Sequence, residues 1–341
     1  MKKLHLIIPD LFLPADFAAE VCSGLVLPAL QKILARGRGE NGAAIPLENH
    51  LSALFGMPAS PDAPIAPIAA TFDGLQTDIS SETGWLCVSP AHLRLQRDQV
   101  LLLPVPDIQA DEAVQFCRAL NEYFDGQGMV FDAPHPQRWY VRLDKLPEMN
   151  SLPLSQVSGR NIHGLLPKGA DATRWYQIFN DIQMLLFAHP LNELREERGM
   201  LSVNGVWLWG GGVMCDTLTQ PYDCVSSDDV LATMLAKHSG VGFSGWMKRW
   251  QLEASCNRQL LVWTGLRQAL QQGDWGTWRE ALLDFEAGYA QPIWQALRNG
   301  RLTQLRFDVL SGSGTRCTEL TRADTWALWR RNRALDQYAI V

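Results

Sequence analysis

The sequence predicts an α/β protein whose mostly parallel sheet core is interrupted by a smaller α+β domain. Three observations lead to this prediction. After residue 200, strand-like apolar runs alternate with helical segments, and parallel strands need such helices as crossover connections. The apolar run His5–Ile8, which ends at Pro9 and Asp10, would add a first strand to that later sheet. Between the two lies a stretch whose elements follow a ββαββ order.

The pattern of apolar and proline residues divides the chain. Apolar residues at helical spacing predict a helix over residues 25–35, and a short helix is expected at Leu51–Phe55, before Gly56. Residues 57–72 are rich in proline, which predicts a linker or an irregular surface segment. We therefore assign residues 1–74 and 201–341 to a discontinuous α/β core and residues 75–200 to the inserted α+β domain.

The remaining elements follow from the same patterns. In the inserted domain we expect strands at Trp85–Val88, Gln99–Leu103, Gly128–Phe131 and Trp139–Leu143, and helices at Asp111–Phe124 and Ala172–Ala188. In the later core we expect strands at Val203–Trp209, Gln259–Trp263 and Leu305–Leu310, and helices at Asp228–His238, Trp275–Leu297 and Ala323–Leu335.

Composition excludes several classes of partner. The formal charge of −6 argues against nucleic acid, because neutralising phosphates needs a basic surface. No apolar run is long enough for a membrane span. The short apolar run after the two N-terminal lysines fits a β-strand better than a signal peptide. Seven scattered cysteines without a C-x-x-C pair predict reduced, mostly buried thiols in a cytoplasmic protein. The spacing of Cys215 and Cys224 matches no zinc-ligand pattern.

Two segments carry residues suited to chemistry. Asp10 directly follows the first strand, and ligands of open parallel sheets bind beyond the carboxyl ends of strands; the alternative is an ordinary loop aspartate. Gly210, Gly211 and Gly212 follow another strand and could offer backbone N–H groups to an anion. Arg195 could add a planar guanidinium for phosphate or carboxylate, unless this helix is only a solvated charged surface.

The same residues carry a resemblance to a known family. His189, Asn192, Arg195, Asn204 and the strand that ends in glycines resemble the pattern of archaeal-type cofactor-independent phosphoglycerate mutases. A fuller set of motifs resembles a proteobacterial branch of that family, the RpfE-type regulatory proteins. This set comprises Ile8–Phe12, Leu27–Leu30, Leu86–Asp98, Arg138–Leu143, Pro153–Arg160, Gln183–Leu185 and Trp207–Gly212. The resemblance covers residues 4 to about 215 and weakens afterwards.

The resemblance implies an alkaline phosphatase-like fold with two divalent metals and a serine or threonine that accepts the phosphoryl group. Asp10 matches the first metal-binding aspartate of the family, but Leu11 and Phe12 replace the glycine and second aspartate expected after it. Residues 46–50 hold no hydroxyl group where the nucleophile is expected, and Ser52 falls inside a helix.

The later metal-ligand motifs of the family are also missing from this sequence. The strand at 259–263 is followed by Trp263-Thr-Gly-Leu-Arg267 instead of an Asp/His cluster. The strand at 305–310 is followed by Ser311–Arg316 instead of an Asp-His pair, and no histidine occurs after His238. Asp274 and Asp308 alone cannot reproduce a two-metal site, which needs several convergent ligands.

The sequence therefore predicts a non-catalytic relative of phosphoglycerate mutase that binds a small phosphorylated or carboxylated ligand and acts in regulation. The predicted ligand-binding residues are Asp10, Arg94, Arg97, Asp98, His189, Asn192, Arg195, Asn204, Gly210, Gly211 and Gly212. We expect no cofactor. One alternative is an active phosphotransferase with Mn or Zn held by Asp10, Asp216 or Asp223. Another is a protein-interaction module that uses Trp246, Trp250, Trp275 and Trp278.

Overall fold

The computed structural model describes residues 1–77, 83–105, 107–215 and 218–339. The chain forms two compact units, which we call unit 1 and unit 2. Unit 1 is discontinuous and comprises Met1–His50 and Thr219–Val341, whereas unit 2 is the continuous stretch Leu51–Leu218. This division lies at residues 50 and 218, whereas the sequence analysis placed the domain boundaries at residues 74 and 200.

Unit 1 is built on one seven-stranded sheet. Its strands are β1 (Lys3–Pro9), β2 (Arg38–Gly42), β10 (Cys224–Ser227), β11 (Gly242–Gly245), β12 (Arg258–Val262), β13 (Gln304–Ser311) and β14 (Gly314–Thr321). Their order is β11-β10-β12-β1-β13-β14-β2. The first five are parallel to one another, and β14 and β2 are antiparallel at one edge. The predicted α/β fold with a mostly parallel sheet is confirmed, and β1 joins the later strands as expected.

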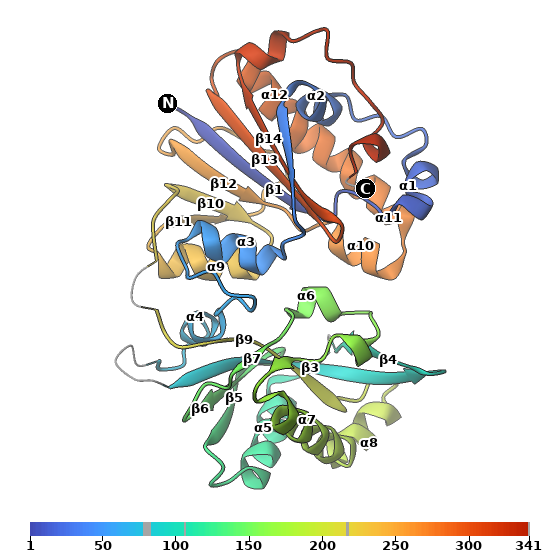
Figure 1. The fold of residues 1–341 in the computed structure, drawn as a ribbon, viewed down its shortest axis with the longest axis vertical. Helices are drawn as coiled ribbons and strands as arrows, with labels where there is room; N and C mark the ends of the chain where they lie inside the picture. The colour runs from blue at the N-terminus through green and yellow to red at the C-terminus, as the bar shows by residue number, and fades with distance from the viewer. Residues whose placement is uncertain (78–82, 106, 216–217, 340–341) are drawn as a thin grey trace. The chain divides into compact units, whose positions relative to one another are not determined.

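Helices cover both faces of this sheet (Figure 1). The helices of unit 1 are α1 (Ala15–Cys22), α2 (Pro28–Arg36), α9 (Val230–His238), α10 (Arg267–Gln272), α11 (Trp275–Phe285) and α12 (Gln291–Arg298), and α3 (Leu47–Leu54) spans the division between the units. The predicted helix at residues 275–297 is confirmed, although a π-helical turn at Glu286–Ala290 separates α11 from α12.

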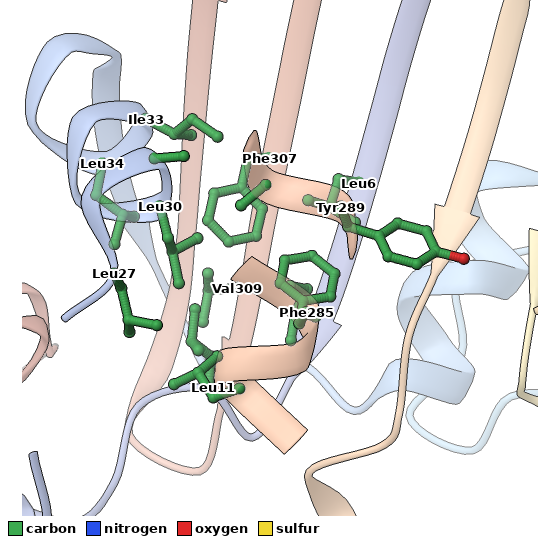
Figure 2. Close-up of a cluster of buried hydrophobic side chains, with 14 of the residues drawn as sticks. Leu6, Leu11, Leu27, Leu30, Ile33, Leu34, Phe285, Tyr289, Phe307 and Val309 are labelled. Carbon is green, nitrogen blue, oxygen red and sulfur yellow. The ribbon is translucent and has the colours of Figure 1, made fainter. Parts of the chain in front are cut away.

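One face of the sheet buries the main core of unit 1. Because side chains alternate along a strand, Leu4, Leu6 and Ile8 of β1 enter this core, whereas His5 and Ile7 lie on the opposite face. Figure 2 shows Leu6 beside Phe307 of β13, with the apolar stripe of α2 and the aromatic rings of α11 and the π turn packed against them. Burial of this apolar surface is the main source of stability in unit 1.

The π turn also holds α2 in place. The carboxylate of Glu286 accepts hydrogen bonds from the backbone N–H groups of Ala29 and Leu30, at 2.7 and 3.0 Å. These N–H groups lie in the first turn of a helix, where they have no partner within the helix, and a negative charge there is favourable. Glu286 is therefore a buried capping residue supplied by a distant part of the chain.

Unit 2 contains an antiparallel sheet of five strands. They are β3 (Gly84–Gln96), β4 (Gln99–Pro104), β5 (Met129–His135), β6 (Arg138–Leu143) and β9 (Gly205–Gly212); β7 (Met149–Asn150) and β8 (Lys168–Gly169) form a separate pair. The helices are α4 (Ala66–Phe72), α5 (Ala110–Tyr123), α6 (Leu154–Val157), α7 (Ala172–Phe187) and α8 (Pro190–Glu197). The predicted order of two strands, a helix and two strands is confirmed, and α5 and α7 pack against the sheet in one core.

The sheet assigned to one predicted strand is wrong, and so are two other predicted segments. The strand at residues 203–209 belongs to unit 2, because β9 pairs antiparallel with β3. The proline-rich segment contains α4, in which Pro67 lies in the first helical turn, where a missing N–H is tolerated. The final helix at residues 323–335 is replaced by two 3₁₀ turns, Ala323–Trp326 and Leu335–Tyr338. In this last segment Leu328 and Trp329 are exposed, and a short helix gains its stability mainly by burying an apolar face.

The expectation that all cysteines are reduced is wrong as well. Cys224, at the start of β10, and Cys256, just before β12, form a disulfide that closes a sequence separation of 32 residues. Their spacing gave no sign of pairing, because disulfide connectivity cannot be read from sequence alone. The other five cysteines are free. Within the described residues, no helix combines the length and apolar character that crossing a membrane requires.

Candidate functional site

Asp10 lies at the carboxyl end of β1, where the sequence analysis placed it. Asp10 adopts a left-handed backbone conformation (φ 62°), which aspartate tolerates better than most residues. Its backbone N–H donates to Leu310 O at the end of β13. The side chain forms an ion pair with Arg267, whose Nε lies 3.2 Å from Asp10 Oδ2. Arg267 opens α10, directly after β12, so the pair joins the ends of two neighbouring strands.

Further carboxylates surround Arg267. Burial opposes its charged form, but the negative charges of Glu48, Asp10 and Asp229 outweigh this effect and raise the pKa of Arg267. Asp229 also caps α9, since its carboxylate accepts from Leu231 N at 2.9 Å. This end of the unit 1 sheet is therefore an acidic cluster with a permanently charged guanidinium in it.

The metals implied by the family resemblance do not fit this cluster. Asp10 is already paired with the Arg267 guanidinium, and the Asp229 carboxylate already binds helix N–H groups. Asp228, on the neighbouring strand end, accepts from Thr264 N at 2.8 Å. In the part of the chain that the structure describes, Asp10 belongs to no group of three His, Cys, Asp or Glu side chains with donor atoms within 4.8 Å. We therefore derive no reaction step through a metal here.

The predicted site residues of α8 and β9 have structural partners within unit 2. Arg195 is fully buried, and its Nη1 lies 2.6 Å from Glu112 Oε2. The side chain of Asn192 donates to Leu186 O and Val203 O and accepts from Val203 N. Asn204 bridges the backbone N–H and C=O of Leu93. These contacts join α8 to α5 and to Val203, and Asn204 to β3. The predicted ligand role of these residues stays a prediction.

The three glycines are part of β9 and do not form a loop after it. The register between β9 and β3 shifts at Gly210 (φ 70°), which is a bulge that only glycine adopts easily. The N–H groups of Gly210 and Gly211 donate to the carboxylate of Asp62, at 3.0 and 3.4 Å. The N–H groups that were expected to receive a ligand anion therefore bind a carboxylate of the chain itself.

The remaining predicted residues are scattered. His189 begins α8, where its Nδ1 accepts from Leu191 N and its ring packs on Phe116. Arg94, Arg97 and Asp98 are exposed at the end of the β3–β4 hairpin. For the alternative metal site, Asp223 bonds to the backbone and side chain of Arg258, and Asp216 lies outside the described residues.

The structure brings together a polar cluster that the sequence analysis missed. On the face of the sheet opposite the main core, Asp308 of β13 accepts from His5 Nε2 of β1 at 2.9 Å and from His50 Nε2 of α3 at 3.1 Å. Arg306 pairs with the same carboxylate, and Tyr222 Oη lies 2.6 Å from His5 Nδ1. A histidine and an aspartate inside otherwise apolar strands were the available signal for this cluster.

Burial and hydrogen bonding act in opposite directions on this cluster. Burial of Asp308 opposes its charged form, but the hydrogen bonds from His5, His50 and Arg306 hold its pKa well below the usual range. Burial lowers the pKa of His5 despite its bond to Asp308. At neutral pH the cluster therefore contains an ionised carboxylate beside a neutral His5 imidazole.

Comparison with known proteins relates parts of the chain to one family, although no family model matches it. It is 39% identical over 64 residues to a probable 2,3-bisphosphoglycerate-independent phosphoglycerate mutase of Geobacter sulfurreducens, which is 19% of this chain and 16% of that protein. It is 29% identical over 105 residues to the 2,3-bisphosphoglycerate-independent phosphoglycerate mutase of Methanothrix thermoacetophila, 31% of this chain and 26% of the relative. The chain thus matches only a sixth to a quarter of these relatives' length.

A solved structure supports the fold over a longer stretch. The PH0037 protein from Pyrococcus horikoshii is similar over 94% of this chain and 87% of its own, with a TM-score of 0.52 and 13% identity. At this identity the similarity concerns the fold alone. It agrees with the mixed α/β architecture and the mostly parallel sheet described above.

Proposed function

We propose that this chain, whose homologues are cofactor-independent phosphoglycerate mutases, is a non-catalytic member of that group and acts by binding. The proposal includes membership of the RpfE-type regulatory branch, which the sequence motifs resemble. The observation that carries it is the ion pair between Arg267 and Asp10. It supports the loss of phosphoryl transfer, because the chemistry of the family depends on divalent metals at the strand ends.

The charge at the strand ends explains why an arginine can take this place. Asp10, Glu48 and Asp229 would repel one another without a cation among them, and Arg267 supplies a positive charge. A guanidinium satisfies carboxylates but has no open coordination position at which a phosphate oxygen or a nucleophile could bind. The fold is thereby stabilised in the absence of the metals that the reaction would need.

Ligand binding is proposed at the β3–β4 hairpin. Among the predicted site residues, Arg94 and Arg97 are the exposed cations, whereas Arg195 is buried against Glu112. Two guanidinium groups close in sequence suit a phosphorylated or carboxylated small molecule, because each can donate two parallel hydrogen bonds. In this proposal the ligand therefore binds at the hairpin and not at the glycine segment.

Catalysis is tested by assaying the purified protein for interconversion of 2- and 3-phosphoglycerate and for phosphatase activity, with Mn²⁺, Mg²⁺ and Zn²⁺ in turn. The Methanothrix thermoacetophila mutase serves as the positive control. We expect no turnover above background with any metal. Turnover that disappears in Asp10→Ala but persists in Asp98→Ala would show that the strand-end site is active and would overturn the proposal.

Binding is tested by the thermal stability of the protein with 3-phosphoglycerate. A ligand that binds the folded state alone raises the melting temperature, and at a concentration of 100 Kd the stabilisation is about 2.7 kcal/mol. We expect this shift in the wild type and its loss in the double variant Arg94→Ala/Arg97→Ala. Arg118→Ala, which removes another exposed arginine of unit 2, is the matched control and should keep the shift. An equal shift in all three proteins would exclude the hairpin.

A further inference from the structure

One carboxylate oxygen of Asp308 is surrounded by more N–H donors than it can bond to at once. Its Oδ2 lies 2.9 Å from His5 Nε2, 3.1 Å from His50 Nε2, and 3.1 and 3.0 Å from Nε and Nη2 of Arg306. A carboxylate oxygen offers about two lone-pair positions, so four N–H groups cannot all bond well to it. This crowding would be relieved if the two imidazoles presented lone pairs to a cation instead of protons to the oxygen.

The three side chains already converge as metal ligands do. The donor atoms of His5, His50 and Asp308 all lie within 4.8 Å of one another. In a tetrahedral zinc site, bonds of about 2.0–2.2 Å place neighbouring ligand atoms about 3.4 Å apart. The observed separations of 2.9 and 3.1 Å need to widen by only a few tenths of an ångström to admit the ion.

We propose that His5 Nε2, His50 Nε2 and Asp308 Oδ2 bind one divalent metal ion, most favourably Zn²⁺. Two imidazoles and one carboxylate form a ligand set that first-row transition metals prefer over Mg²⁺ or Ca²⁺, which take mainly oxygen ligands. The site lies in the middle of β1 and β13, on the face of the sheet that α3 covers with His50, and it involves neither Asp10 nor Arg267.

A second shell of polar groups supports this assignment. Metal-bound histidines usually bond through their other ring nitrogen, and His5 Nδ1 lies 2.6 Å from Tyr222 Oη. With Nε2 bound to the metal, Nδ1 carries the proton and donates it to the tyrosine oxygen. Arg306 Nε also lies 3.1 Å from Asp308 Oδ1, so the arginine can hold the second carboxylate oxygen while Oδ2 binds the ion.

The cluster is accessible to an ion. The side chain of Asp308 is fully buried, but that of His50 is 11% exposed and that of Arg306 is 40% exposed. Water can therefore supply a fourth ligand. The bound metal would tie β1, β13 and α3 together, which is a stabilising role in unit 1 that is independent of the proposed loss of phosphoryl transfer.

The test begins with protein freed of metal by a chelator and then titrated with Zn²⁺ or Co²⁺. We expect about one ion per chain by elemental analysis, a tetrahedral Co²⁺ absorption spectrum and a higher melting temperature with metal, since ligand binding stabilises the folded state. His50→Ala and Asp308→Asn should lower the affinity by at least about a hundredfold, and Tyr222→Phe by about 10–100-fold, as second-shell changes do. His163→Ala and Asp284→Asn change exposed residues and should bind as the wild type does.

Two results would overturn the metal site. One is a folded wild-type protein that binds neither Zn²⁺ nor Co²⁺ at about micromolar concentration. The other is unchanged stoichiometry in His50→Ala and His50→Gln, with circular dichroism showing both variants folded. Arg267→Ala separates this proposal from the proposed function, because it should keep the metal. Turnover in the mutase assay would contradict only the proposed function, whereas a folded wild-type protein that binds no metal would contradict only this proposal.

Discussion

The backbone N–H of Gly210 donates to the carboxylate of Asp62, 3.0 Å away, so the glycine segment has a hydrogen-bond partner within the chain. The bulge at Gly210 releases N–H groups of β9 from pairing with β3, and Asp62 accepts them. Ser151 Oγ adds a third donor at 2.6 Å. The segment thus builds an internal anion site within unit 2.

The first prediction concerns this internal anion. Asp62→Ala leaves the buried Gly210 N–H without its partner, so it should lower the free energy of unfolding by about 1–3 kcal/mol. Urea denaturation monitored by tryptophan fluorescence measures this change. Asp98→Ala removes an exposed aspartate and should change stability by less than about 0.5 kcal/mol. Equal effects in the two variants would contradict a structural role for Asp62.

The second prediction concerns the buried pair Arg195–Glu112. Removing one partner of a buried ion pair strands the other charge, so Arg195→Ala should destabilise the protein by about 3–5 kcal/mol. Arg198→Ala, three residues further along and exposed, is the matched control and should be nearly neutral. In the double variant Arg195→Met/Glu112→Leu no charge remains unpaired, and we expect most of the lost stability to return. Failure to recover it would point to the backbone bonds of Arg195, or to the bond between Glu112 and Gln109 N that caps α5, as the larger contribution.

The third prediction is a pH dependence in unit 2. Burial opposes ionisation of Asp73, but hydrogen bonds from Arg138 and Tyr140 at 2.6–2.8 Å hold its pKa below the ordinary 3.8. The folded state therefore binds fewer protons than the unfolded state near that pH. The stability that Asp73 contributes is complete above about pH 5 and is lost as the pH falls through the folded pKa.

Asp73→Asn isolates this contribution. We expect the variant to be less stable than the wild type by about 1–2 kcal/mol at pH 7, a value reduced for the partial exposure of Arg138. Between pH 5 and pH 3 its further loss of stability should be smaller than that of the wild type. Urea denaturation across this pH range measures both quantities. Parallel pH profiles for the two proteins would show that Asp73 does not titrate as described.

The fourth prediction concerns the disulfide between Cys224 and Cys256. Closing a loop of this length restricts the unfolded chain, and the loop-entropy model gives about 3–4 kcal/mol of stabilisation. The double variant Cys224→Ser/Cys256→Ser should therefore melt at a lower temperature than the oxidised wild type. Dithiothreitol should destabilise the wild type but leave that variant unchanged. Cys215→Ser is the control, and mass spectrometry of the unreduced protein checks the bond directly.

The core elements could be predicted from sequence because their signal is local. The apolar run of β1 and the apolar stripe of α2 each appear within a few residues, and both elements were correctly placed. The edge strand β2 could not be predicted, since Arg38–Gly42 is fully exposed and becomes a strand only by pairing with β14. Its strand conformation comes from tertiary contacts and not from its own residues.

The candidate sites were harder to predict for the same reason. Arg195 belongs to a helix rich in charged residues, so its sequence context predicts an exposed side chain. In the structure its side chain is buried and forms an ion pair with Glu112. His5 and Asp308 are 303 residues apart, so no pattern within the sequence joins them. Asp10 could be recognised because its position directly after a strand is visible in the local sequence. Its partner, Arg267, could not be identified in this way, because it lies far along the chain.

The position of β1 between β12 and β13 has a consequence for synthesis on the ribosome. Residues 3–9 are made first, but both of their neighbours in the sheet come after residue 257. Unit 2 is continuous and complete once residue 218 has emerged, so it can fold before β1 has strands to pair with. A nascent chain stalled after residue 270, with its last few tens of residues still inside the ribosome, should therefore contain protease-resistant unit 2 and a protease-sensitive N-terminal segment. Completion of the C-terminal strands then closes unit 1 in a late, long-range step.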